Sequence, residues 1–364
     1  MKIVYFTFLA FLYLSFCSCS EQDESSSDGT IEVVFKANSM VANEAQNSNE
    51  LSVITFKSDE SGIFSFLSNE DNTNWVSEEN GTMTKKILLS TGKYRFLMAR
   101  GFSSDASDKN SILFLKEEGV TGGYDCDYYF KYPSDDNEKR LKPCSTELFI
   151  DSNEPGFESN HTDYSLFEGN KFSVSRKVTR LQGRLDFMIR RGEWANGKLK
   201  PISEGDNNED ALANALNKIE SIQVTAGNIS TRCHVNGLIC STPRSYIFDL
   251  PKSDFVPFKS KDFVSELKGI KQSDYSGFDN SAYKKGPLLF SAPEDGEISL
   301  DMTITYKAPL QPKKILQEVE LKRNKVALVI LWLLNEEIGI DVTVDQDNLV
   351  FGDGTANGDD GFWN

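Results

Sequence analysis

Histidine is nearly missing from this chain: it has two histidines, His161 and His234, among 364 residues. With so few, no Ser-His-Asp set, no Cys-His nucleophile pair and no HExxH zinc motif can be drawn. A Walker loop and a strand–GxGxxG–helix unit are absent too, so no nucleotide-binding motif is present. We therefore predict that the chain is not an enzyme, and we assign it no catalytic residue and no cofactor.

Positive charge is also in short supply, with 39 Lys and Arg against 55 Asp and Glu and a net charge of −16. An acidic surface repels the phosphates of nucleic acids, so nucleic acid is excluded as a partner. With so many carboxylates, some pairs will lie close together by chance. A secreted hydrolase with acidic catalytic residues therefore stays as an alternative, although no sequence motif marks the pair.

Beyond the first 18 residues the chain has no long apolar run. The longest is Val326–Leu334, whose nine residues are typical of a buried strand. A membrane-spanning helix needs about 20 apolar residues. At the start of the chain, Lys2 precedes an apolar run over Ile3–Phe16, which is too short to span a bilayer. This pattern predicts a signal peptide over residues 1–18.

Two cysteines follow that run, and Cys19 is preceded by the small residue Ser18, whereas Cys17 follows the bulky Phe16. The arrangement resembles the lipobox of bacterial lipoproteins and predicts a lipid on Cys19. Residues 19–28 are acidic and rich in serine, as in a flexible linker. They also resemble the surface-export signal of Bacteroidota lipoproteins, which implies the outer face of the outer membrane. Soluble secretion and a periplasmic spacer are the alternatives.

Four further cysteines lie at positions 126, 144, 233 and 240. Asn236-Gly237 is a strong hairpin-turn signal, and the resulting antiparallel pairing places Cys233 directly opposite Cys240. Opposed residues lie about 4.5–5.5 Å apart at Cα, within disulfide range. We predict that bridge, and by elimination a second one between Cys126 and Cys144. Cysteine and histidine are too sparse for a metal site.

Most of the chain alternates apolar and polar residues, as strands of antiparallel sandwiches do when one face is buried and the other is wet. The clearest case is Ser299–Tyr306. One helix is expected, over Glu209–Ile219, because Leu212, Leu216 and Ile219 form a single stripe. The other expected strands cover residues 30–36, 51–57, 85–89, 93–99, 184–190, 326–334 and 338–344.

The residues at 353–359 have oxygen-bearing side chains at positions 1, 3, 5 and 7 and a glycine at position 6, as in an EF-hand loop. However, position 12 is Asn364 and no helices are expected on either side. A disordered Gly- and Asp-rich tail is the better interpretation, and we predict no metal site.

Four stretches together resemble the fimbrillin superfamily of Bacteroidota, most of all its membrane-anchor branch. They are the lipobox with its acidic tail, residues 52–66 with the hairpin at 89–101, residues 178–189, and residues 319–331. The resemblance implies a mainly all-β fold of two tandem transthyretin-like β-sandwich domains, here with one short helix. We expect these domains to cover residues 29–176 and 177–364.

The resemblance also implies assembly by donor-strand exchange, in which a protease trims an N-terminal strand after a basic residue and a neighbour's strand fills the exposed groove. Lys36 is the earliest basic residue after Cys19 and so the candidate processing point, while the first arginine is Arg95. The stretch 352–364 is a poor donor strand by its alternation.

We therefore expect the outer-membrane anchor of a fimbria with a role in adhesion. Its partners would be other fimbrial subunits, joined by strand addition, and host or bacterial surface ligands. A fimbrial tip subunit or adhesin, and a non-polymerising surface lipoprotein that binds a glycan or a host protein, remain as alternatives.

Overall fold

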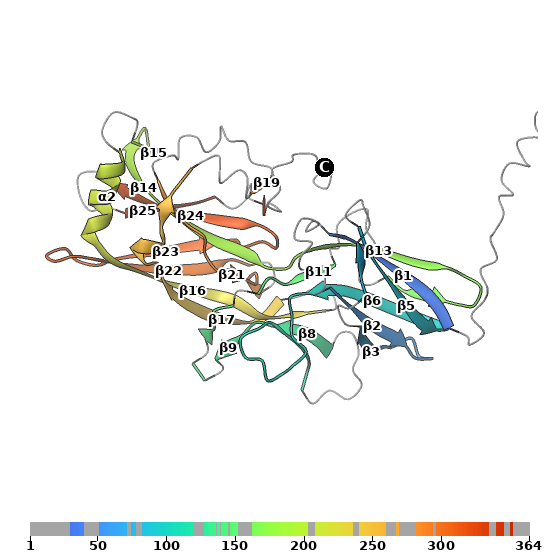
Figure 1. Cartoon of the computed structure of the whole chain (residues 1–364). Helices are drawn as coiled ribbons and strands as arrows, with labels where there is room; N and C mark the ends of the chain where they lie inside the picture. Colours follow the sequence, from blue (N-terminus) through green and yellow to red (C-terminus); the bar gives the residue numbers. More distant parts are fainter. Residues whose placement is uncertain are drawn as a thin grey trace, which may run out of the picture.

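The computed structural model (Figure 1) describes residues 30–39, 51–70, 74–77, 82–118, 127–135, 137–138, 140–144, 146–151, 162–202, 208–235, 240–259, 267–268, 281–293, 296–334, 340–345 and 350–351. The predicted signal peptide, the predicted lipidation site Cys19, the acidic linker, Cys126, His161, the predicted turn at Asn236-Gly237 and the calcium-like tail fall outside these ranges. Within them, no helix is both long enough and apolar enough to cross a membrane.

The N-terminal half is a curled sheet with the strand order β3-β2-β6-β11-β13-β1-β5-β4, and β12 pairs with β6. Its short strand β11 pairs with both β6 and β13 and so joins two facing layers. The bounds are β1 Thr30–Ser39, β2 Ser52–Ser58, β3 Phe64–Glu70, β4 Val76–Ser77, β5 Thr82–Ser90, β6 Gly92–Arg100, β11 Phe149–Asp151, β12 Tyr164–Leu166 and β13 Phe172–Arg180.

The C-terminal half packs two sheets face to face, one ordered β23-β22-β16-β17-β10-β9 and the other β18-β20-β14-β24-β25. The first contains β16 Ile219–His234, β17 Cys240–Asp249, β22 Ile298–Tyr306 and β23 Lys313–Val319. The second contains β14 Gly183–Ala195, β18 Val256–Pro257, β20 Ala282–Lys284, β24 Val326–Leu334 and β25 Ile340–Asp345, and β15 Lys198–Pro201 and β21 Leu288–Leu289 also pair with β14.

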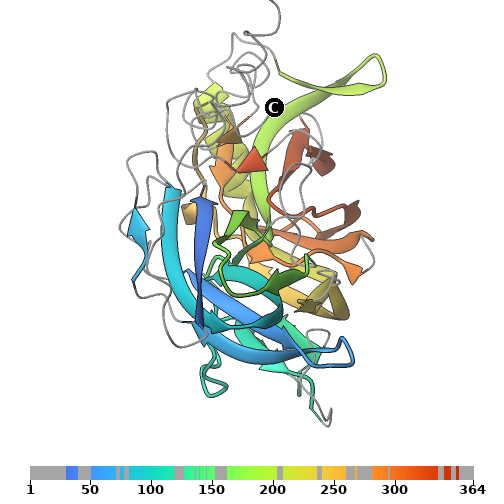
Figure 2. The ribbon, with the colours of Figure 1, turned by 90° about the vertical axis from the view of Figure 1, so that its right-hand side faces the viewer.

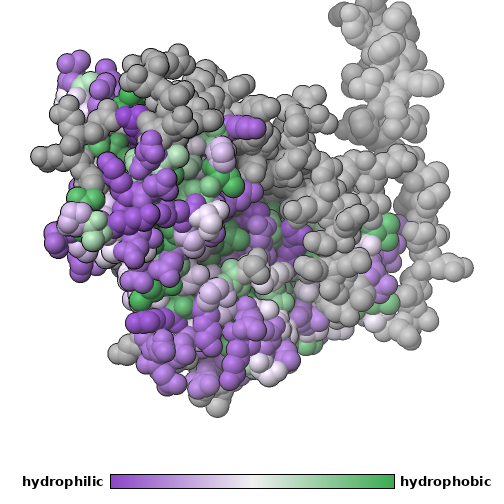
Figure 3. All heavy atoms as spheres, turned by 60° about the vertical axis from the view of Figure 1, so that its left-hand side comes forward, coloured by the Kyte–Doolittle hydropathy of each residue, from purple (hydrophilic) through white to green (hydrophobic). Residues whose placement is uncertain are grey.

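The rest of the C-terminal half consists of short elements. The α2 helix covers Asn208–Lys218, one residue from its expected start and end, and a 3-10 turn covers Lys252–Asp254. The strands β19 Leu267–Lys268 and β26 Val350–Phe351 pair with each other. The β14–β15 hairpin projects from the body in the rotated view of Figure 2. Hydrophilic residues dominate the face shown in Figure 3, with hydrophobic residues scattered among them.

Four short strands from the middle of the chain connect the halves: β7 Leu113–Lys116, β8 Tyr128–Lys131, β9 Ser134–Asp135 and β10 Arg140–Leu141. Although they precede residue 176, β8 pairs with β16 and β10 pairs with β17. Backbone hydrogen bonding therefore crosses the expected domain boundary. The exact limits of the two domains stay a prediction.

Three hydrophobic clusters organise the part of the molecule that the structure describes: an N-terminal core, a core shared by both halves, and a small cluster on the other face of β14 and β24. The N-terminal core contains the buried apolar side chains of β1, β5, β11, β12 and β13, together with one face of β2 and β6. The shared core contains the other face of β2 and β6, the side chains of β7 and β8, and the facing sides of β14, β16, β22 and β24. The prediction of a mainly all-β chain built as β-sandwiches with one short helix is confirmed.

Two expectations about the strands were wrong. Residues 51–57 and 93–99 were expected to have one buried and one wet face, yet residues 51–56 and 96–99 are buried on both faces because a core lies on each side. The pairing is also not purely antiparallel, since β1 pairs with β13 and β14 with β24 in parallel. The prediction that 326–334 is a buried strand is confirmed.

Candidate functional site: the slot of the N-terminal strand

The first described strand, β1, occupies a slot between two strands that come from distant parts of the sequence. It pairs antiparallel with β5, from Thr30 opposite Ser90 to Asn38 opposite Thr82. On its other side it pairs in parallel with β13, where Val33 is opposite Phe172. Both backbone edges of β1 are therefore hydrogen-bonded. Without β1, β5 and β13 would each have an open edge facing the other.

The alternation of apolar and polar residues in β1 fits this slot. Ile31, Val33, Phe35 and Ala37 point into the N-terminal core and are at most 4% exposed. The Phe35 ring meets the Phe96 ring edge to face, with 4.8 Å between centroids. Burying a Val, Ile or Phe side chain contributes about 1.5–3 kcal/mol. Burial of these side chains and the two ladders hold β1 in the slot.

The wall of the slot contains a buried ion pair. Arg176 of β13 lies opposite Ala37, and its Nε is 3.6 Å from Asp151 Oδ2 on β11; both side chains are fully buried. The Met98 backbone N–H donates to Asp151 Oδ1 at 3.1 Å. The Arg176 guanidinium also lies 5.7 Å from the centre of the Tyr164 ring. Burial raises the pKa of Asp151 to about 7, against the opposing effects of Arg176 and the Met98 N–H.

The predicted processing point, Lys36, lies in the middle of β1, opposite Thr84 on one side and Ser175 on the other. Its side chain is exposed, but its backbone belongs to both ladders. Proteases cut chains at exposed, unpaired segments. Cleavage at Lys36 would therefore require β1 to leave the slot first, and the role of Lys36 stays a prediction.

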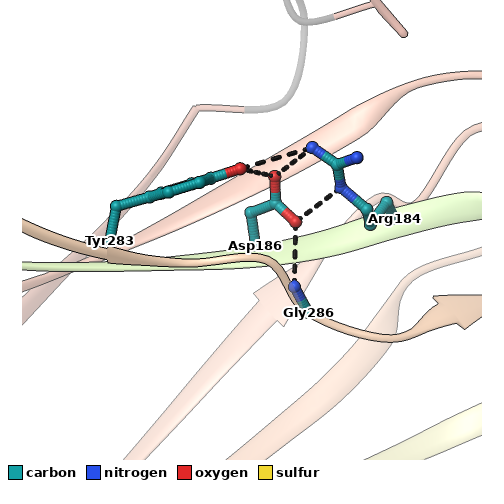
Figure 4. Close-up of polar contacts among 4 residues, drawn as sticks. All are labelled: Arg184, Asp186, Tyr283 and Gly286. Atoms are coloured by element: carbon teal, nitrogen blue, oxygen red, sulfur yellow. Dashed lines mark hydrogen bonds and ion pairs between the residues drawn. The ribbon is translucent and has the colours of Figure 1, made fainter. Parts of the chain in front are cut away.

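The Arg-Leu pattern of residues 180–185 was part of the fimbrillin resemblance, and it leads into a network around Asp186 (Figure 4). Arg184 donates from Nε to Oδ1 and from Nη2 to Oδ2 of Asp186, at 2.7 Å each. The Tyr283 hydroxyl donates to Oδ2 at 2.5 Å, and the Gly286 N–H to Oδ1 at 3.0 Å. This fully buried carboxylate therefore links β14 to β20 and to the segment that follows β20.

A second arginine of that pattern, Arg180, reaches across to two other segments. Its Nη2 donates to Glu147 at 2.7 Å and its Nη1 to the side-chain oxygen of Asn324 at 3.4 Å. Asn324 lies in the tight turn before β24 with a φ of 52°. The two motifs read from the sequence, around 180 and around 324, are thus brought together at the start of β14 and β24. Their role is to position strands.

The cysteines give one correction. Cys144 has a free thiol, so the bridge predicted from it to Cys126 was wrong. The Cys144 side chain packs against the shared core, and burial raises the pKa of its thiol. Pairing by elimination had no geometric support. For the other pair, the register is as expected, with Cys233 opposite Cys240 in the β16–β17 ladder. That bridge stays a prediction.

His234, the one described histidine, has its ring 5.8 Å from that of Tyr129, beside the end of β16. Within the described part of the chain, no group of three or more His, Cys, Asp and Glu residues could hold a metal ion. Two functional-looking features escaped the sequence reading: the Asp151–Arg176 pair and the Asp186 network. The sequence did contain a signal for Asp186, because it is the one charged residue in the apolar run Leu185–Ile189.

No protein-family model and no curated protein matches this chain. Solved structures do. A candidate adhesin from Bacteroides thetaiotaomicron is 13% identical with a TM-score of 0.47, covering 90% of this chain and 100% of its own. The fimbrial anchor protein Mfa2 from Porphyromonas gingivalis is 11% identical with a TM-score of 0.44, covering 89% and 99%. A fimbrial assembly protein from Parabacteroides distasonis is 9% identical with a TM-score of 0.39, covering 87% and 98%.

Because every one of these TM-scores is below 0.5 and every identity is below 25%, the likeness does not assign a function. The function of this chain has to be derived from its own residues.

Proposed function

We propose that this chain is a cell-surface fimbrial subunit, held at the outer membrane through a lipid on Cys19, and that it anchors the fibre. The observation that carries the proposal is the filled slot. A strand that follows the predicted lipid attachment site by about ten residues is part of the N-terminal core. As long as the chain between Cys19 and β2 stays uncut, the lipid remains covalently linked to the folded body.

Two features support retention of β1. No arginine lies between Cys19 and Tyr94, so an arginine-directed protease finds no cutting site before β6. The single lysine in β1, Lys36, has both backbone edges paired. A slot that keeps its own strand cannot accept the strand of a neighbouring subunit. This chain would then be the last subunit at one end of a fibre. Because it carries the predicted lipid, we place it at the end that is attached to the membrane.

The first test is the N-terminus of the mature protein. Mass spectrometry of protein isolated from the cell surface should find a lipidated Cys19 and peptides that cover residues 30–39. A mature chain that begins after residue 39 would show that β1 is removed, and the anchor proposal would then be wrong. Immunogold labelling should place the protein where fibres meet the cell. Label at the free ends would favour a tip subunit instead.

The second test uses two neighbouring cysteines as a matched pair. Cys19→Ala should abolish incorporation of labelled palmitate and release fibres into the medium. Cys17→Ala lies in the predicted signal peptide and should leave labelling and fibre retention unchanged. If fibres stay on cells that produce only Cys19→Ala protein, the lipid of this chain does not hold them.

A further inference from the structure

The strand β23 forms one end of its sheet, and its side chains have an unusual distribution. It pairs with β22 alone among the strands that the structure describes; β25 of the opposite sheet lies near it without pairing. Leu316, at its centre, is 73% exposed, more than any other large hydrophobic side chain described. Backbone groups on an open sheet edge can bind another strand.

The two ends of β23 have opposite charge. Lys313 and Lys314 lie at its start, and Glu318 lies near its end. The Glu318 carboxyl is hydrogen-bonded to that of Glu297, and with Glu320 nearby this raises the pKa of Glu297. Because Glu320 forms an ion pair with Lys322, the repulsion at this end is mainly between the carboxyls of Glu297 and Glu318. A partner with positive charge at this point would relieve the repulsion.

We propose that the β23 edge pairs antiparallel with the β23 edge of a second copy of this chain, with the twofold axis at Leu316. In this register, Lys314 of each copy lies opposite Glu318 of the other, and the two Leu316 side chains meet at the axis. Lys314, Leu316 and Glu318 all point to the exposed side of the sheet. The strand is therefore complementary to itself in shape and charge.

The alternation of side chains between the two faces of the sheet limits the possible registers. Residues directly opposite each other across an antiparallel pair share a face, so a twofold axis perpendicular to the sheet has to lie midway between the two copies of one residue. An axis at Ile315 would place Lys314 opposite Leu316, and an axis at Gln317 would place Leu316 opposite Glu318. Within β23, only the axis at Leu316 places opposite charges directly across from one another, an arrangement that stabilises cross-strand pairs. The axis at Gln317 would place Lys314 opposite Glu320, but Glu320 lies beyond the end of β23 and is paired with Lys322.

Charged residues on an edge strand also have a competing explanation, because proteins use them to block pairing. A blocking role requires only that charge be present. Pairing between copies requires a particular order of charge along the strand. Variants that keep the number of charged residues on the strand but reverse the sign of one of them therefore separate the two explanations. The proposal does not depend on the anchor role or on the fate of β1.

Charge reversal gives the decisive experiment, read by analytical ultracentrifugation of the full chain over a range of concentrations. The wild-type chain should dimerise. Lys314→Glu alone and Glu318→Lys alone should each weaken dimerisation about tenfold, since each places like charges opposite one another twice. An equimolar mixture of these two variants should recover it, because each strand then complements the other.

The exposed Lys200→Glu on β15 is the matched control and should dimerise like the wild type. A monomeric wild-type chain at every concentration would overturn the proposal. So would a mixture of the two reversed variants that associates no better than either variant alone.

Cross-linking tests the position of the axis. Under mild oxidation, Leu316→Cys should form a disulfide-linked dimer, since opposed residues lie within disulfide range. Asp301→Cys is the control: it lies opposite Leu316 on β22, exposed but one strand further from the axis. Equal cross-linking of both variants, or none from Leu316→Cys, would contradict the proposed pairing.

Discussion

At the scale of single residues, the buried carboxylate of Asp186 accepts four hydrogen bonds, two of them from Arg184. Asp186→Asn removes the negative charge and leaves the largely buried guanidinium without its counter-ion. Breaking such a pair costs about 3–5 kcal/mol. We expect a loss of this size in the free energy of unfolding, measured by urea denaturation.

Tyr283→Phe provides the comparison, because it removes one donor to Asp186 and keeps the ion pair. Its cost should be about 1–2 kcal/mol. If Asp186→Asn were no more destabilising than Tyr283→Phe, the ion pair would not be what stabilises this junction between β14 and β20.

The Asp151–Arg176 pair predicts a dependence of stability on pH. Burial raises the pKa of Asp151 to about 7, from an ordinary value of 3.8. Between these two values, the folded chain binds a proton at Asp151 that the unfolded chain has lost. The contribution of Asp151 to stability is therefore fully present below pH of about 4 and is lost as the pH rises to about 7.

This dependence can be isolated with Asp151→Asn, which keeps an oxygen that can accept the Met98 N–H and cannot titrate. The free energy of unfolding should be measured for both proteins from pH 4 to pH 8. The wild type should lose stability relative to Asp151→Asn as the pH rises. A difference that stays constant, or that grows in favour of the wild type, would show that Asp151 is ionised in the folded chain throughout.

At the scale of elements, β1 is held by its inward-facing side chains, and this gives a paired prediction. Phe35→Ala should lower the free energy of unfolding by about 3–5 kcal/mol, because it opens a cavity against Phe96. Val34→Ala, on the outer side of the same strand, should cost less than about 1 kcal/mol. Urea denaturation measures both. Similar costs at the two positions would mean that β1 is not seated in the N-terminal core.

The same element shows how far sequence patterns reach. The sequence pattern located the start of β1 and placed its end three residues early, and the Leu212–Ile219 stripe located α2 within one residue at each end. These signals are local. The pairing of β1 with β13, about 140 residues away, is set by packing and left no local signal. Alternation also failed for β2 and β6, because it cannot anticipate a second core on the far side of a strand.

For the candidate site too, only the features with a local sequence signal could be predicted. The β1 strand was recognised, since its signal lies within ten residues, whereas Lys36 as a processing point stays a prediction. The Arg176–Asp151 pair was not, because the two residues come from different strands and meet only in the folded sheet. The free thiol of Cys144 was missed for the same reason, as its surroundings come from several distant segments.

At the scale of the whole molecule, the two halves should unfold together. The shared core takes side chains from both halves, and β8 inserts Phe130 opposite Cys233 of β16. Phe130 also lies 5.5 Å, between ring centroids, from both Phe102 and Phe114. Phe130→Ala should therefore cost about 3–5 kcal/mol and lower the unfolding temperature of the whole chain.

Two tryptophans can report on the halves separately, since Trp75 donates to the Leu51 carbonyl in the N-terminal half and Trp332 is buried in β24 of the C-terminal half. In variants that keep one of these two and replace the other three of the four tryptophans by Phe, fluorescence should give coincident unfolding curves, and Phe130→Ala should shift both curves equally. Phe167→Ala, at a side chain that is 53% exposed, should shift neither curve measurably. Two separate transitions, of which Phe130→Ala moves only one, would mean that the halves are independent domains. Coincident transitions would mean that the two halves unfold as one cooperative unit.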